Sequence, residues 1–91
     1  MTEQQAMQQA MRYFDSGEFQ RLLARRVACA TESQRADRDG ELNHYLQQEI
    51  APQLAALGFT LHFIDNPAAA NAPFLVATRI EEATLPTLLL Y

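Results

Sequence analysis

Apolar residues recur at helical spacing through the first half of the chain, and strand-like runs occupy its last third. The first stripe predicts a helix from about Thr2 to Phe14, which Asp15-Ser16-Gly17 then interrupts. Its apolar positions are Ala6, Met7, Ala10, Met11 and Phe14. The order of elements, helices first and strands afterwards, is typical of a two-layer α+β or α/β unit.

A second helix is predicted after this interruption, with Ser16 as its N-cap and Glu18 in its first turn, where a negative charge is favourable. We expect its buried stripe to consist of Phe19, Leu22, Leu23, Val27 and Ala30. Arg21, Arg25 and Arg26 fall mostly between these positions, so they are expected to face water.

A third helix is predicted to follow the polar loop Thr31–Asp39, with Asp37 or Asp39 as its cap, and to run to Leu57. Its stripe is Leu42, Tyr45, Leu46, Ile50, Leu54 and Leu57. Pro52 removes a backbone donor inside this helix, so we expect a bend there or a break into two helices. Gly58 suits the left-handed conformation that ends helices.

Two strands are predicted next, Phe59–Asp65 and Phe74–Ile80, and the loop between them indicates a wide antiparallel hairpin. Phe59, Leu61 and Phe63 are expected on one face of the first strand. After a short acidic turn, Pro86 opens a continuously apolar run, Thr87–Tyr91, typical of a strand buried on both faces. Its abrupt end suggests the front part of a larger fold.

The composition is that of a soluble globular protein, at 48% hydrophobic and 20% charged, and 91 residues allow a single domain, 1–91. We expect three helices packed on a small sheet of about three strands. The net charge of −4 argues against nucleic acid as a partner, because such binding needs a concentrated basic surface. With one cysteine, no secretory signal and no membrane-length apolar run, the sequence predicts a soluble cytoplasmic protein without membrane partners.

No complete catalytic, cofactor-binding or metal-binding constellation can be assembled from the sequence, so no site residue of any of these kinds is assigned. His44 and His62 lack a companion ligand nearby in sequence, and both are expected to be solvated or structural. Cys29 lies near a helix C-terminus, which does not stabilise a thiolate, so it is interpreted as a packing residue. Glu81 and Glu82 are interpreted as solubilising residues on a turn.

Several segments nevertheless occur in a familiar order: Arg25-Arg26-Val27-Ala28, Thr31-Glu32-Ser33-Gln34, Glu49-Ile50-Ala51-Pro52, Leu57-Gly58-Phe59, Asp65-Asn66-Pro67, Pro73-Phe74-Leu75-Val76-Ala77 and Pro86-Thr87-Leu88-Leu89-Leu90-Tyr91. From about Phe19 onward the chain resembles the opening of a zinc-dependent metallopeptidase of the aminoacylase and carboxypeptidase type. That family includes acetylornithine deacetylase and succinyl-diaminopimelate desuccinylase.

The resemblance implies part of an α/β/α zinc-exopeptidase-like domain, with the strand Thr87–Tyr91 leading into a Gly-His-x-Asp motif that supplies the first zinc ligand. The sequence ends before that motif, so no zinc ligand or general base is carried over to any residue here. The chain would then be an inactive N-terminal scaffold of a zinc-dependent amidohydrolase or peptidase, with possible self-association through Thr87–Tyr91.

Two alternatives stay open at this point. The chain is alternatively a free-standing α+β interaction module whose exposed sheet edge binds a partner strand. The other alternative is a thiol or histidine enzyme built on Cys29 with either His44 or His62.

Overall fold

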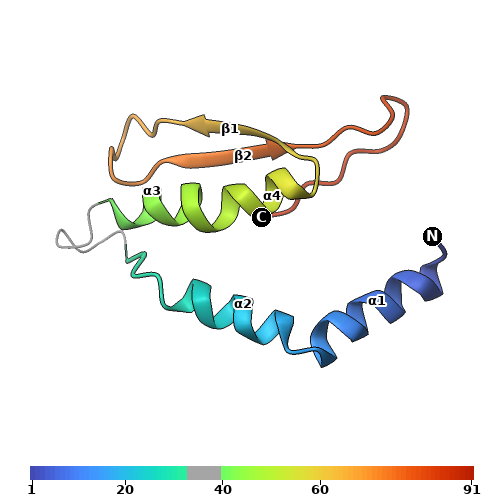
Figure 1. The fold of residues 1–91 in the computed structure, drawn as a ribbon. Helices are drawn as coiled ribbons and strands as arrows, with labels where there is room; N and C mark the ends of the chain where they lie inside the picture. Colours follow the sequence, from blue (N-terminus) through green and yellow to red (C-terminus); the bar gives the residue numbers. More distant parts are fainter. Residues whose placement is uncertain (33–39) are drawn as a thin grey trace.

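The computed structural model describes residues 1–32 and 40–91 as three helical segments and a two-stranded sheet (Figure 1). Its elements are α1 (Glu3–Asp15), α2 (Glu18–Val27), α3 (Glu41–Tyr45), the π-helical η2 (Leu46–Ile50), α4 (Ala51–Ala56), β1 (Thr60–Ile64) and β2 (Phe74–Thr78). This mixed α+β arrangement confirms the predicted class in outline. The sheet has two strands where the sequence predicts about three.

Helix α1 confirms the first predicted helix to within a residue. Thr2 caps it: the Thr2 hydroxyl accepts a hydrogen bond from the Gln5 backbone at 3.1 Å, and the Gln5 side chain accepts one from the Thr2 backbone at 2.9 Å. None of its side chains is buried, and Met7, Met11 and Phe14 are all exposed. Figure 1 shows α1 reaching away from the sheet, with α2 as its neighbour.

Helix α2 corrects two expectations. Its N-cap is Gly17, in the left-handed conformation (φ 85°), while the hydroxyl of Ser16 accepts the Glu18 backbone N–H at 3.3 Å. The stripe predicted to be buried is largely uncovered, since Val27 is 75% exposed and Leu23 49%, and Ala30 lies beyond the end of the helix. A stripe is buried only where another layer covers it, and the sequence pattern does not reveal whether that layer is present.

Elements α3, η2 and α4 follow one another without a gap, so of the two effects expected of Pro52, a bend or a break into two helices, the break does not occur. Instead, the backbone widens into a π-turn, in which the Ala51 N–H bonds to the carbonyl of Leu46, five residues earlier. Pro52 follows this wider turn as the second residue of α4, where it offers no N–H to the carbonyls of the preceding turn. The cap of α3 is Gly40, and the proposed caps Asp37 and Asp39 lie outside the described residues.

Gly58 ends this helix as predicted, with φ 86°. The Phe59 N–H bonds to the Leu54 carbonyl at 3.1 Å, and the Gly58 N–H bonds to the Ala55 carbonyl at 3.0 Å, which together form a Schellman motif. This turn reverses the chain, so β1 runs back along the helix that precedes it (Figure 1).

Strands β1 and β2 form the predicted antiparallel hairpin; β1 is one residue shorter than predicted at each end, and β2 begins at Phe74 as predicted but ends two residues early. Leu61 pairs with Ala77 and Phe63 with Leu75, and these residues point to the same face of the sheet. Leu61, Leu75 and Ala77 are half-buried on that face, and β1 packs against α4. Among the described residues only Ala51 is buried outright, at 6% exposure.

The terminal run does not form the predicted strand. Residues 85–91 have no regular structure, and Leu88, Leu89 and Leu90 are about four-fifths exposed. They lack the neighbouring strands and covering layers that such a run needs.

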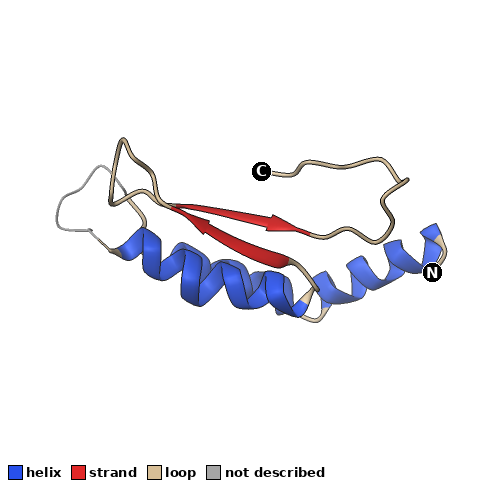
Figure 2. Cartoon of the chain, turned by 90° about the horizontal axis from the view of Figure 1, so that it is seen from above, coloured by secondary structure: helices blue, strands red, loops and turns tan. Residues whose placement is uncertain are grey.

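The fold as a whole leaves much surface open to solvent. Its accessible surface is 7777 Å², whereas a compact monomer of this mass exposes about 5,400 Å². The radius of gyration is 16.1 Å, against about 12 Å for a compact chain of this length. The molecule is accordingly flat and extended, 47 × 36 × 17 Å, as the view from above also shows (Figure 2).

The left-handed turn at Gly58 leads to a first prediction. Gly58→Ala should lower the free energy of unfolding by about 1 kcal/mol, because a Cβ disfavours this conformation. Gly58→Asn should lower the free energy of unfolding by less, since among the other residues asparagine best tolerates a left-handed backbone. Urea denaturation followed by circular dichroism measures both. Equal losses for the two variants would contradict the Schellman turn as the cause.

Candidate functional site

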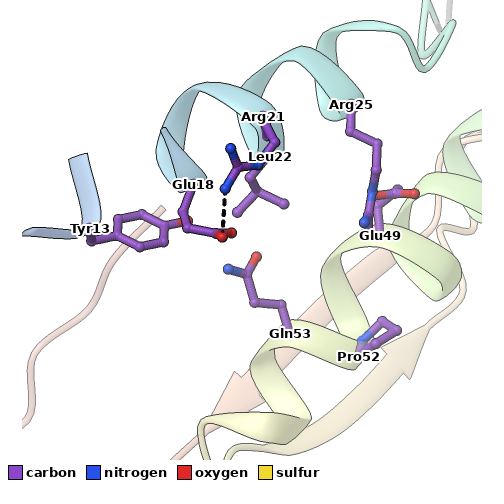
Figure 3. A pocket seen from close by; sticks show the side chains of 8 residues that line it. All are labelled: Tyr13, Glu18, Arg21, Leu22, Arg25, Glu49, Pro52 and Gln53. Carbon is purple, nitrogen blue, oxygen red and sulfur yellow. Dashed lines mark hydrogen bonds and ion pairs between the residues drawn. The ribbon is translucent and has the colours of Figure 1, made fainter. Parts of the chain in front are cut away.

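A cleft of about 710 Å³ lies between α2 and the helix opposite, and two arginine and two glutamate side chains line it (Figure 3). Its walls come from the end of α1, from α2, from η2 and from α4. The lining residues are Tyr13, Glu18, Arg21, Leu22, Arg25, Glu49, Pro52 and Gln53. We therefore take this cleft as the candidate functional site.

One ion pair spans the cleft. The Arg25 Nε donates to Glu49 Oε2 at 2.7 Å, joining α2 to η2 across 24 residues of sequence. The Glu49 side chain is only 16% exposed, whereas that of Arg25 is 64% exposed. The carboxylate therefore depends on this guanidinium for much of its solvation.

Arg26 makes the neighbouring cross-connection. Its guanidinium donates to the Gln53 side chain of α4, and its Nε is buried without a hydrogen-bond partner. Arg25 and Arg26 were expected to face water: Arg25 does so, with a side chain that is 64% exposed, whereas the guanidinium of Arg26 is partly buried against α4. Both side chains make polar contacts from α2 to the helix opposite, because a long arginine side chain can pack its stem while its head group reaches a partner.

The remaining charged pair in the cleft is local. Arg21 donates to Glu18 at 2.6 Å one helical turn earlier, and both side chains are well exposed. Each of the four charged side chains that line the cleft is thus paired with another of the four. This arrangement is suited to joining helices, since its charges already neutralise one another.

The residues that the sequence singles out for chemistry are dispersed. His44 is exposed on α3, and His62 is exposed on β1, where its Nε2 lies 3.5 Å from the Thr78 hydroxyl. Cys29 follows α2, half-buried, with its thiol 3.5 Å from the Arg25 carbonyl. No hydrogen bond in the described parts of the chain joins Cys29 to either histidine. The arrangement gives no support to a thiol–histidine pair.

Glu81 and Glu82 make separate contacts. Glu81 pairs with Arg79 at 2.7 Å, and Glu82 accepts a hydrogen bond from the Thr84 hydroxyl at 3.1 Å. Within residues 1–32 and 40–91 there is no cluster of three or more His, Cys, Asp or Glu side chains placed to hold a metal ion. The described residues therefore do not fit a zinc site, and no reaction step is assigned to one.

Comparison with known proteins leaves the family open. No family model, curated protein or solved structure matches this chain. In the described residues, none of the helices combines the length and the apolar character needed to cross a membrane.

The ion pair across the cleft supplies a second prediction. Arg25→Gln should lower the free energy of unfolding by about 0.5–1 kcal/mol, since the half-buried carboxylate of Glu49 loses its partner. Arg21→Gln is the matched control, because Arg21 is equally exposed and its pair lies within one helix. Chemical denaturation at low and high salt measures both. A loss for Arg21→Gln as large as that for Arg25→Gln would contradict the role assigned to the inter-helix pair.

Proposed function

We propose that this chain serves as a scaffold layer in a zinc-dependent amidohydrolase or peptidase of the aminoacylase and carboxypeptidase type. In this role it provides framework, while the zinc ligands and the general base come from polypeptide outside residues 1–91. The observation that carries the proposal is a sheet with a helical layer on one face only. The family is inferred from the order in which the sequence motifs occur from Phe19 onward.

The uncovered face of the sheet is formed by the side chains that alternate with the half-buried ones. Ile64, Phe74 and Val76 lie there, each between 44% and 52% exposed. In an α/β/α domain a second helical layer covers such a face, and burial of apolar surface contributes about 25 cal/mol per Å². The open face is therefore the side on which the rest of such a domain would pack.

In the proposed domain, Thr87–Tyr91 forms a third strand beside β2. The chain after β2 makes a turn and heads back in the direction of the hairpin, as Figures 1 and 2 both show. Its five residues match the five residues of β2 in length. In a complete enzyme of this type, bound zinc would activate water for hydrolysis of an amide bond; the contribution of this chain is to hold the strand that leads to the site.

One observation favours a second candidate function, a free-standing module that binds a strand of another protein. The outer edge of β2 is unpaired, and a free sheet edge is a common docking surface for an extended peptide. This candidate requires no catalytic group and no cofactor.

The third prediction concerns catalysis. We expect the purified chain, incubated with zinc and either N-acyl amino acids or dipeptides, to release no more product than zinc at the same concentration. The physical reason is that a scaffold without converging ligands cannot lower the pKa of a bound water. Turnover above the metal-only control, abolished by a chelator, would contradict the proposal that this chain acts as scaffold.

Sequencing the DNA that follows the Tyr91 codon distinguishes the two candidate functions. The hydrolase proposal expects a Gly-His-x-Asp continuation there, in frame or after a frameshift. If that sequence is absent, and hydrogen exchange on a monomer finds Thr87–Tyr91 well protected, the interaction module is favoured instead.

A further inference from the structure

We propose that two copies of this chain pair by exchanging their terminal segments. Residues Thr87–Tyr91, here named the exchange segment, would lie along the free edge of β2 in the other copy. The contact is reciprocal, so each copy both donates a segment and accepts one. This inference uses only the free edge and the segment, and it does not rest on the hydrolase proposal.

The accepting surface is the edge of β2 that does not face β1. Strand β2 (Phe74–Thr78) contains no charged residue and no proline, and its pairing with β1 is regular, without a bulge. Lysines, prolines and bulges are the usual devices that keep sheet edges from pairing with other chains. This edge has none of them along its five residues.

The donating segment has the matching properties. Leu88, Leu89 and Leu90 are 78–84% exposed, and the segment makes no backbone hydrogen bond to a strand. It is apolar, uncharged and as long as β2. Exposed backbone donors and acceptors and exposed leucines both gain from pairing with a strand edge.

The link between β2 and the exchange segment keeps the two apart within one copy. Arg79 and Glu81 form an ion pair at 2.7 Å, and the Leu85 N–H bonds to the Glu82 carbonyl at 3.2 Å, which shapes a separate turn. The segment follows this turn without reaching the edge of its own β2. The edge therefore stays available to a second copy.

Surface area and charge both allow a second copy as the occupant. The chain as a whole exposes about 2,400 Å² more than a compact monomer of its mass, and a stable interface needs about 800 Å² from each partner, which is a third of that surplus. Although the net charge is −4, neither β2 nor the exchange segment has a charged side chain. A symmetric pair thus brings no like charges into direct opposition across the new strand contact.

The fourth prediction tests the pair by its mass. Analytical ultracentrifugation should find a species of twice the 10.3 kDa chain mass that dissociates on dilution. Leu89→Glu should shift it to the single-chain mass, because a carboxylate would be placed in the new contact. Met11→Glu is the matched control at an exposed apolar position on α1, and it should leave the mass unchanged. A single-chain mass at all concentrations would overturn the proposal, as would a ladder of larger species.

Cysteine cross-linking distinguishes exchange from docking within one copy. In a Cys29→Ser background, chains with Val76→Cys are mixed under mild oxidation with chains carrying either Leu88→Cys or Leu89→Cys. Neighbouring strand residues face opposite sides, so one of the two mixtures should form a heterodimer and the other should not. Equal cross-linking in both would indicate random collision. An intrachain disulfide in a chain carrying both cysteines, with no heterodimer in the mixtures, would show that each segment docks on its own β2.

Discussion

The Schellman turn at Gly58 is the contact on which the remaining arrangement depends. By satisfying the carbonyls of Leu54 and Ala55, it ends the long helix and sends β1 back along that helix. The hairpin can then place Leu61 and Ala77 toward α4, so the half-buried face of the sheet forms from residues near one another in sequence. Contacts of this kind close with little loss of chain entropy, which suits a chain that buries so little surface.

Helices α1 and α2, which lie outside this helix–hairpin unit, have no buried residue. Helix α2 is joined to it by the Arg25–Glu49 and Arg26–Gln53 contacts, which are polar and partly open to water. Helix α1 touches mainly α2, through ring contacts of Phe14 and Tyr13 with Phe19. A helix of 13 residues is marginal in water without packing, so its capping box is a large part of its support.

Residue type and spacing predicted the helices and strands whose formation depends on neighbouring residues. The extent of the first helix, the helix end at Gly58 and the hairpin were all evident from residue type and spacing. Expectations failed where the outcome depends on a distant partner: Val27 lacks a covering layer, and Arg26, expected to face water, contacts Gln53 of α4. Glu49 and Gln53 lie four residues apart and so share a helix face, but no sequence rule indicates that this face meets α2. The terminal run remained uncovered for the same reason, since a buried strand needs neighbours that its own sequence does not supply.

The π-turn before Pro52 has a consequence for how this helix tolerates changes in length. It acts as a one-residue insertion absorbed inside the helix, and it aligns Ala51 with Leu46, five positions earlier, on the same side. Deleting one residue between 46 and 50 would let this stretch close as a regular α-helix, in which the residue now at position 51 bonds to Leu46 across four positions. The small, buried Ala51 would then keep its alignment with the turn before it. The π-turn therefore lets the helix hold one more residue while the position of the hairpin against it is kept.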